Sequence, residues 1–353
     1  MAQRKVVIIG AGYSGLAAAY ELVQSGVHVE IFEQDSEVGG LAGTFELSPG
    51  VRIEKFYHHW FTSDRAVLSL IEELGLGSNL KYLQTNTGLY FANSVFRLAS
   101  PLDLLCFSGI PFIDRVRTGL MALYARRIND WHKLEAQSAE EWLIRIGGRR
   151  SYQAIWKPLL AGKFGVEAPN ISAVWFWNKL KLRGSSRDPQ GKESLVYFKG
   201  GFGTLTAGLR EKLQTLGVQI HLNTAVQKVC VEAGRCTGLQ TAAGQVSADA
   251  VLCTVPLPTF LAMTPDLPAD FKSSAERIRF LGNVCLVLRL RRSLSDTYWL
   301  NVADPVIDDG IARRRPLIFH VLHSNLMTAI RQGGLKRNKN LRLVRLARRA
   351  QYP

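Results

Sequence analysis

A glycine-rich turn close to the N-terminus constrains the fold more than any other feature. Residues 4–9 form a short apolar, β-branched run that is typical of a buried parallel strand. The turn Gly10-Ala11-Gly12-Tyr13-Ser14-Gly15 follows directly, and the helix-forming residues 16–23 come next. Residues 27–33 then form a second predicted strand. This order of strand, turn, helix and strand predicts a βαβ unit of about 30 residues.

Each glycine of the turn has a physical role in such a unit. The first permits the tight turn, the second lets the backbone approach a pyrophosphate, and the third lets the helix pack close to the strand. Tyr13 and Ser14 lie where the helix N-terminus offers N–H groups and a positive dipole end to phosphates. Glu33, 18 positions after Gly15, would accept hydrogen bonds from a ribose. The alternative is a tight turn without a ligand.

A second glycine cluster, Glu37-Val38-Gly39-Gly40-Leu41-Ala42-Gly43-Thr44, follows the second strand. Loops at the carboxyl edge of a parallel sheet bind ligands. Two adjacent glycines at that edge indicate backbone pressed against a ligand too large for one loop. The alternative is a surface loop with no ligand.

These motifs resemble those of the FAD-dependent flavin amine oxidase superfamily, which includes protoporphyrinogen oxidases, carotenoid desaturases and, more distantly, UDP-galactopyranose mutases. Residues 199–205 are similar to the family's central glycine stretch, and residues 248–256 to its strand that ends at a proline near the cofactor. Residues 217–226 resemble the strand that runs toward the adenine, which Val226 would meet through its backbone. The resemblance spans roughly residues 4–305 and implies FAD as the cofactor.

The sequence departs from the family pattern at Leu41, where the amine oxidases usually carry an arginine near the pyrophosphate. Phosphate binding would then depend on backbone N–H groups, as in the protoporphyrinogen-oxidase-like and mutase-like branches. The residues predicted to bind the cofactor are Gly10, Gly12, Tyr13, Ser14, Gly15, Glu33, Gln34, Gly39, Gly40, Leu41, Ala42, His58 and Val226.

Residues 57–61, Tyr-His-His-Trp-Phe, carry the candidate catalytic residue. The resemblance implies that this segment approaches the flavin ring, with His59 where the mutase branch has a histidine. An imidazole there could hydrogen-bond the flavin or the substrate. We expect no metal, because two adjacent histidines rarely face one ion. The alternative is that His58 and His59 are a packed or exposed pair without a chemical role.

The expected fold class is α/β, with a discontinuous Rossmann-type FAD-binding domain, a mostly helical inserted substrate domain and a partial substrate sheet. The FAD-binding domain takes residues 1–80 and 199–258, and the helical lid domain takes residues 81–198. Residues 259–306 begin the substrate sheet, and residues 307–353 form a basic tail that we expect to be poorly ordered.

Three features of the insertion bear on its role. The spacing of Ser138 and Glu141 predicts a capping box at a helix start. Residues 101–128 have apolar side chains at helical spacing, but the charges mixed among them argue against contact with a membrane. The aromatic run at residues 175–177 lines a pocket or, as such runs more often do, belongs to the core.

The net charge of +15 is concentrated at the C-terminus. Residues 310–353 hold 11 Lys and Arg and no acid, whereas the preceding 309 residues hold 33 basic and 29 acidic residues. A folded nucleic-acid-binding domain would carry its charge on its surface, so no specific nucleic-acid partner is expected. The family's closing Gly-Asp segment is missing after Pro305. Our hypothesis is that residues from about 306 are out of register through a frameshift or misassembly. The alternative is a basic tail whose weakly amphipathic residues 341–349 touch anionic lipid or nucleic acid.

Composition excludes several other classes of protein. A hydrophobic content of 47% excludes a disordered chain, and no apolar run is long enough to span a membrane. Five cysteines without a C-x-x-C motif argue against a disulfide framework or a zinc ribbon. The early glycines interrupt any signal-peptide pattern, so we expect a cytoplasmic protein, with peripheral membrane contact left open.

The function expected from the resemblance is hydride abstraction from a C–N or C–C bond of a small or apolar substrate to flavin N5. No Ser/His/Asp arrangement or carboxylate pair stands out, which fits an enzyme whose cofactor carries the chemistry. Two alternatives stay open: a flavin-dependent nucleotide-sugar mutase, and a truncated flavoprotein without activity.

Overall fold

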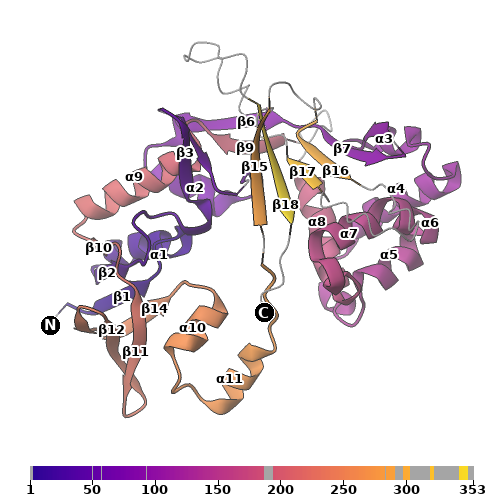
Figure 1. The fold of residues 1–353 in the computed structure, drawn as a ribbon. Helices are drawn as coiled ribbons and strands as arrows, with labels where there is room; N and C mark the ends of the chain where they lie inside the picture. Colours follow the sequence, from indigo (N-terminus) through magenta and orange to yellow (C-terminus); the bar gives the residue numbers. More distant parts are fainter. Residues whose placement is uncertain are drawn as a thin grey trace. The chain divides into compact units, whose positions relative to one another are not determined.

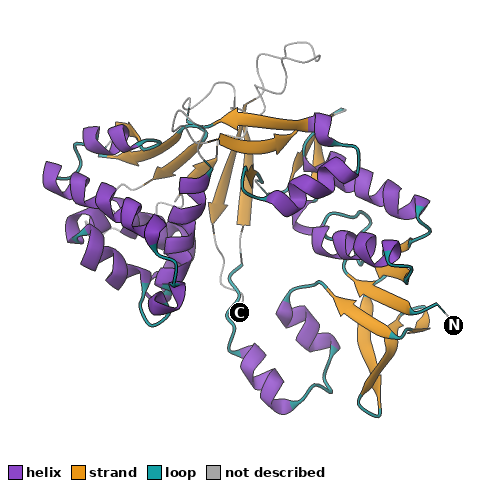
Figure 2. Cartoon of the chain, turned by 180° about the vertical axis from the view of Figure 1, so that it is seen from behind, coloured by secondary structure: helices purple, strands orange, loops and turns teal. Residues whose placement is uncertain are grey.

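The chain divides into two compact units, shown in Figures 1 and 2. The structure, a computed structural model, describes residues 3–49, 51–56, 58–92, 94–186, 194–282, 284–290, 297–302, 319–321 and 342–348. Unit 1 comprises Met1–His58, Ala66–Leu80 and Phe198–Phe280. Unit 2 comprises His59–Arg65, Lys81–Tyr197 and Leu281–Pro353.

Unit 1 is built on a parallel sheet with the strand order β10-β2-β1-β14. The four strands are β1 (Lys5–Ile9), β2 (His28–Phe32), β10 (Gln219–His221) and β14 (Ala250–Cys253). Helix α1 (Tyr13–Gln24) connects β1 to β2, which confirms the predicted βαβ unit. Helix α9 (Phe202–Thr215) packs against α1 and β10.

Side-chain alternation along β1 gives the sheet two buried faces. Val7 and Ile9 pack with Phe32 against Val229 and Leu239, which come from the antiparallel β11-β12-β13 sheet. Ile8 alternates with them, points to the opposite face and is fully buried. The strand is therefore covered on both sides, as its continuous apolar sequence predicts.

The other elements of unit 1 are β3 (Thr44–Ser48), β4 (Val51–Glu54), α2 (Arg65–Glu73), β11 (Val226–Glu232), β12 (Arg235–Thr241), β13 (Gly244–Ser247), α10 (Leu257–Met263) and α11 (Ala269–Glu276), with short 3-10 turns η1 (Gly40–Ala42) and η2 (Gly77–Asn79). Helices α10 and α11 differ from the expected boundaries, which placed residues after 258 in the substrate sheet. Met263 of α10 packs on Val229 of β11, so this segment adds to the core of unit 1.

Unit 2 contains a six-stranded sheet of order β15-β18-β17-β16-β7-β8 and a three-stranded sheet of order β5-β9-β6. Their strands are β5 (Trp60–Phe61), β6 (Leu80–Gln84), β7 (Thr87–Phe91), β8 (Ser94–Arg97), β9 (Ser194–Phe198), β15 (Val284–Leu290), β16 (Trp299–Val302), β17 (Phe319–Val321) and β18 (Arg342–Arg348). The helices are α3 (Pro101–Cys106), α4 (Phe112–Arg127), α5 (Ala139–Gly147), α6 (Arg149–Ser151), α7 (Lys157–Phe164) and α8 (Ala173–Ser185), with turns η3 (Trp131–Leu134), η4 (Tyr152–Trp156, a π-helix) and η5 (Gly165–Asn170).

The helices of unit 2 gather in one cluster around an aromatic core (Figure 2). Trp142, Phe176 and Trp177 are buried there, and the Trp177 indole donates to the Ala125 carbonyl at 2.8 Å. The aromatic run in α8 thus supplies core side chains. The capping box of α5 is confirmed, because Ser138 Oγ accepts from the Glu141 N–H and Glu141 Oε2 accepts from the Ser138 N–H.

Two strands come from the C-terminal tail that was expected to be poorly ordered. Strand β18 pairs antiparallel with β15 over its whole length, from Val284 opposite Arg348 to Leu290 opposite Arg342. The stretch with a weak amphipathic pattern is therefore extended rather than helical. Among the helices that the structure describes, none combines the length and the apolar character needed to cross a bilayer.

An ion network ties three strands of unit 1 together. Glu30 on β2 contacts Lys5 Nζ at 2.6 Å and His221 Nε2 at 2.9 Å. The His221 ring stacks on Phe32, with ring centroids 4.5 Å apart. Burial raises the pKa of Glu30, but the hydrogen bonds and charges of Lys5 and His221 lower it more, so the net pKa lies below the ordinary value.

We expect Glu30→Gln to destabilise the fold at neutral pH by about 1–2 kcal/mol, because Lys5 and His221 lose their carboxylate. A carboxylate with a lowered folded pKa stabilises above its unfolded pKa and loses that contribution as pH falls. The difference between wild type and Glu30→Gln should therefore shrink below pH about 4. Urea unfolding at both pH values measures it, with Glu21→Gln, an exposed glutamate of α1, as the control. A difference that persists in acid would contradict the assignment.

Candidate functional site

The turn between β1 and α1 has the geometry that its sequence predicts. Gly12 is the N-cap residue of α1 and makes no side-chain cap, so the N–H groups of the first turn are not capped by residue 12. A Cβ at Gly15 would collide with the carbonyl oxygen of Gly10. Glycine at position 15 is therefore required for the close approach of helix to turn. Ser14 is exposed beside them.

The second glycine loop lies directly against this turn. The Gly39 N–H donates to the Ala11 carbonyl at 2.8 Å, and Gly39 forms a parallel bridge with Gly12. A Cβ at Gly40, where φ is +54°, would lie 3.1 Å from the Cα of Gly12. The two loops thus meet backbone to backbone, and a side chain at position 40 would press on the first turn. Leu41 is 76% exposed.

Glu33 points into the same turn from the end of β2. Its carboxylate is buried and accepts the Ala11 N–H at 2.7 Å through Oε2 and the Asp35 N–H at 3.0 Å through Oε1. A carboxylate has further acceptor positions, so these bonds fix its direction and leave it able to accept from a ligand hydroxyl. Gln34 beside it is exposed.

The segment before β11 is held against the same sheet edge. The Thr224 N–H donates to the Glu33 carbonyl at 2.8 Å, and the Asn223 N–H donates to the Asp35 carbonyl at 3.0 Å. Val226 follows as the first residue of β11 and packs partly buried on the core of the parallel sheet. The structure therefore brings residues 223–226 beside Glu33, although they are nearly 200 positions apart in the sequence.

Thr254, which the sequence did not single out, braces the turn from behind. Its Oγ lies 2.9 Å from the Ile9 carbonyl and 3.2 Å from the Gly10 carbonyl, to which it donates. A Cβ at Gly15 would also lie 3.1 Å from this oxygen. The sequence located the strand that ends here but carried no signal for the hydroxyl, because the contact forms only when β14 pairs with β1.

The Tyr13 side chain points toward α9. Its hydroxyl donates to the Phe202 carbonyl at 2.8 Å and accepts from Thr206 Oγ at 3.2 Å, and burial raises its pKa above the ordinary value. Glu54, fully buried, accepts the Phe202 N–H at 2.9 Å at the start of α9. Tyr13 and Glu54 therefore join α1, β4 and α9, and Tyr13 contributes to the turn through its backbone.

The two adjacent histidines belong to different units. Nδ1 of His58 lies 3.0 Å from the Phe56 carbonyl, and its ring lies 5.3 Å from that of Phe202. Nδ1 of His59 lies 3.2 Å from the hydroxyl of Tyr298, a buried residue of unit 2. The His59 ring also meets Phe61 and Trp299 edge to face. Tyr298 was not found from the sequence, since nothing local links it to residue 59.

These features define a dinucleotide-binding protein of the Rossmann type, in which backbone N–H groups and a carboxylate meet at one sheet edge. The sequence profile of the family "Flavin containing amine oxidoreductase" matches residues 13–331, and the chain belongs to this family. FAD is its cofactor.

Curated relatives of similar sequence include carotene desaturases and a putative flavin-containing monoamine oxidase. A zeta-carotene desaturase of Synechocystis is 28% identical over 48% of this chain and 39% of that protein. The zeta-carotene desaturase of Solanum lycopersicum is 23% identical over 81% of this chain and 54% of that protein. A zeta-carotene-forming phytoene desaturase of Myxococcus xanthus is 24% identical over 85% of this chain and 62% of that protein. The chain thus spans about two to three fifths of the length of these relatives.

Solved structures share the fold. An oxidoreductase of Methanosarcina mazei has a TM-score of 0.75 at 14% identity, with 98% of this chain and 78% of that chain covered. Reduced UDP-galactopyranose mutase has a TM-score of 0.72 at 17% identity, with 99% of this chain and 75% of that chain covered. Putrescine oxidase bound to putrescine has a TM-score of 0.66 at 18% identity, with 98% of this chain and 75% of that chain covered. These similarities confirm the predicted α/β fold class.

Replacement of Gly40 by Ala tests the contact between the two loops. Gly40→Ala places a Cβ against the Gly12 backbone and should weaken FAD binding by about tenfold or more, because the phosphate-facing amides shift. Gly26→Ala is the matched control, since Gly26 also has a positive φ (+77°) but has open space around its Cβ position. Both variants should lose about 1 kcal/mol of stability from backbone strain. Fluorescence titration of apoprotein with FAD measures the affinity, and equal affinities in the two variants would refute the role of the contact.

Proposed function

We propose that this protein is an FAD-dependent oxidoreductase that removes a hydride from a C–C or C–N bond of an apolar substrate. When bound, FAD accepts the hydride at N5. The observation that carries the proposal is the meeting of the two glycine loops at the carboxyl end of β1, beside the Glu33 carboxylate.

The residues around this turn fit FAD. The approach of the Gly40 backbone to Gly12 is too close for an unstrained side chain at position 40, which suits N–H groups that must reach a diphosphate. Leu41 brings no charge, so the amides at the start of α1 and in the second loop carry phosphate binding. Glu33 would accept ribose hydroxyls, and the backbone of Val226 would meet the adenine, because Asn223 and Thr224 hold the segment before Val226 beside Glu33.

The substrate class is supported by the relatives. The carotene desaturases described above act, by their names, on carotenes, and this favours dehydrogenation of a C–C bond in an apolar molecule. His59 is the residue we assign to the substrate side of the flavin. The Tyr298 hydroxyl, 3.2 Å from its Nδ1, orients the imidazole ring.

Nucleotide-sugar isomerisation is the second candidate, favoured by the structural similarity to the reduced mutase. Its chemistry differs in an observable way, because an isomerase needs a reduced flavin and transfers no net electrons. The third candidate is a flavoprotein without activity, whose bound flavin would neither be reduced by a substrate nor support isomerisation.

The test begins with an absorbance spectrum of the purified chain, in which the two visible bands of oxidised flavin are expected. Anaerobic addition of a carotene in detergent micelles should bleach those bands, whereas a primary amine should bleach them more slowly. Turnover of UDP-galactopyranose only after prior reduction would favour the mutase. Bound flavin that no substrate reduces, and that supports no isomerisation, would overturn the proposed activity.

We expect His59→Gln to slow flavin reduction by about 10- to 100-fold with unchanged flavin content. Tyr298→Phe removes the hydroxyl on Nδ1 and should slow reduction less, while shifting the pH dependence of the rate. His132→Gln, an exposed histidine of the same unit, is the control. Stopped-flow reduction across pH measures both effects. Rates in His59→Gln equal to the control would remove His59 from the reaction.

A further inference from the structure

Helix α4 buries polar side chains and exposes large apolar ones, which is the reverse of an ordinary surface helix. Its buried residues are Asp114, Thr118, Met121 and Ala125, which follow one another at helical spacing. A surface helix normally buries its apolar stripe and exposes its polar one. In α4 the first half of the buried stripe is polar.

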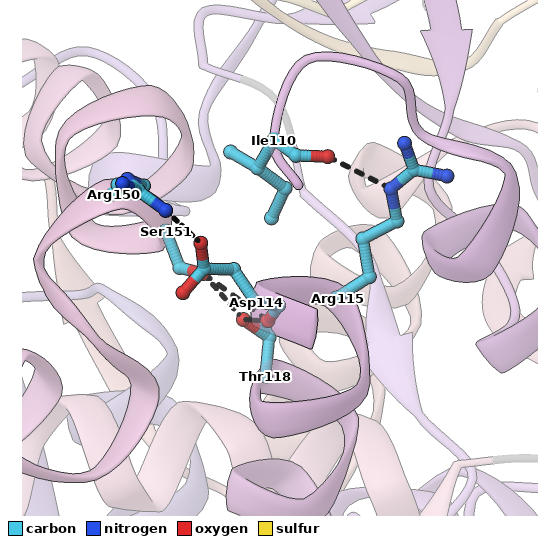
Figure 3. A network of polar contacts seen from close by, with 6 residues as sticks. All are labelled: Ile110, Asp114, Arg115, Thr118, Arg150 and Ser151. Atoms are coloured by element: carbon cyan, nitrogen blue, oxygen red, sulfur yellow. Dashed lines mark hydrogen bonds and ion pairs between the residues drawn. The ribbon is translucent and has the colours of Figure 1, made fainter. Parts of the chain in front are cut away.

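Polar contacts hold this orientation (Figure 3). The Thr118 hydroxyl lies 2.8 Å from the Asp114 carbonyl and 2.7 Å from Ser151 Oγ, and both hydroxyls are buried. Arg150 lies 3.6 Å from the Asp114 carboxylate. Rotation of α4 to bury its apolar side would break these contacts and leave the buried Ser151 hydroxyl without them, which lowers stability.

The outward side of α4 carries large apolar side chains at i, i+3, i+4 and i+7 spacing. Those more than a third exposed are Phe112, Ile113, Val116, Leu120, Leu123 and Tyr124, and α3 adds Leu102 and Leu105. We call these eight residues the α3–α4 apolar face. Ile113 is 74% exposed and Leu120 is 60% exposed among the residues that the structure describes. Contiguous apolar surface of this kind marks an interaction site.

Arg115 fixes the two helices of the face to each other. Its Nε donates to the Ile110 carbonyl and its Nη1 to the Leu105 carbonyl, each at 2.8 Å (the first bond is drawn in Figure 3). The turn between α3 and α4 is therefore braced, and the apolar side chains of both helices form one fixed surface.

The exposed charges of α4 are positive. The acids of α3 and α4 are engaged: Asp103 caps α3 and pairs with Arg97, and Asp114 faces inward to Arg150. Arg126 and Arg127 are exposed in the last turn of α4. The mixed charges of the sequence predicted no membrane contact. In the structure the acids of α3 and α4 pair with arginines of other elements, and Arg126 and Arg127 stay exposed at the end of α4.

We propose that the α3–α4 apolar face lies in the headgroup region of an anionic lipid bilayer, without crossing it. An apolar stripe rimmed by arginine is the pattern of helices that lie in this interface. Tyr124 and, just after α4, the partly exposed Trp131 are aromatic residues of the kind enriched at that depth. A bilayer with anionic headgroups complements both the apolar area and the positive rim.

Flotation of the intact chain with vesicles tests the proposal. Wild type should float with equimolar phosphatidylcholine and phosphatidylglycerol, and less with phosphatidylcholine alone. Ile113→Ser with Leu120→Ser should weaken binding by about tenfold or more, since both side chains would enter the interface. The matched control is Val166→Ser with Ile278→Ser, two side chains that are 73% and 57% exposed elsewhere and should leave binding unchanged. Arg126→Gln with Arg127→Gln should weaken binding about tenfold to anionic vesicles only.

Three results would overturn the proposal. The first is no flotation of wild type with either vesicle. The second is equal loss in the apolar-face variant and its control. The third is a wild-type dimer in sedimentation velocity that Ile113→Ser with Leu120→Ser converts to monomer, because the occupant would then be a second copy. Thermal unfolding by circular dichroism verifies that all variants are folded, and none of these readouts depends on bound flavin.

Discussion

The contact of one glycine backbone with another is the constraint on which the cofactor site depends. The bond from Gly39 to Ala11 and the approach of Gly40 to Gly12 hold the second loop on the first turn. All of the residues at the point of contact are glycine or alanine, so the surface offered to a ligand is made largely of peptide groups. Such a surface has its amides fixed before the ligand arrives, and binding then needs little reorganisation. Glu33 belongs to the same arrangement, because it accepts the Ala11 N–H on the side away from that contact.

The parts of the fold that sequence could predict are those specified by neighbours along the chain. The βαβ unit follows from residue spacing within about 30 positions, and the capping box of Ser138 and Glu141 follows from a spacing of three. Both are confirmed. Local rules suffice there because the groups that interact are brought together by the helix or turn itself.

The parts that could not be predicted depend on contacts between distant segments. Thr254 and Glu54 reach the turn and α9 only after strands far apart in sequence have assembled. His58 and His59 look like a pair in the sequence, yet their rings contact Phe202 and Tyr298 in different units. The orientation of α4 escaped prediction for the same reason, since the contacts that decide which side faces inward, among them those of Ser151 and Arg150, come from other elements.

Composition alone did not predict the strands in the C-terminal tail, residues 307–353. A composition rich in arginine predicts a lack of order, but β18 pairs antiparallel with β15 from Arg342 to Arg348. The hypothesis of a reading-frame change from about residue 306 stays a prediction, because strand pairing requires only a compatible pattern and not an ancestral sequence.

The proposed substrate and the proposed lipid contact support each other through one physical property. A polyene partitions into a bilayer and is scarce in water, since each buried CH₂ group is worth about 0.8 kcal/mol. An enzyme for such a molecule gains from residing where the substrate is concentrated. The two proposals nevertheless rest on different residues: the flavin site on backbone of unit 1, and the α3–α4 apolar face on side chains of unit 2. A chain that bound vesicles but oxidised only polar amines would separate them, and the face would then position the protein rather than supply its substrate.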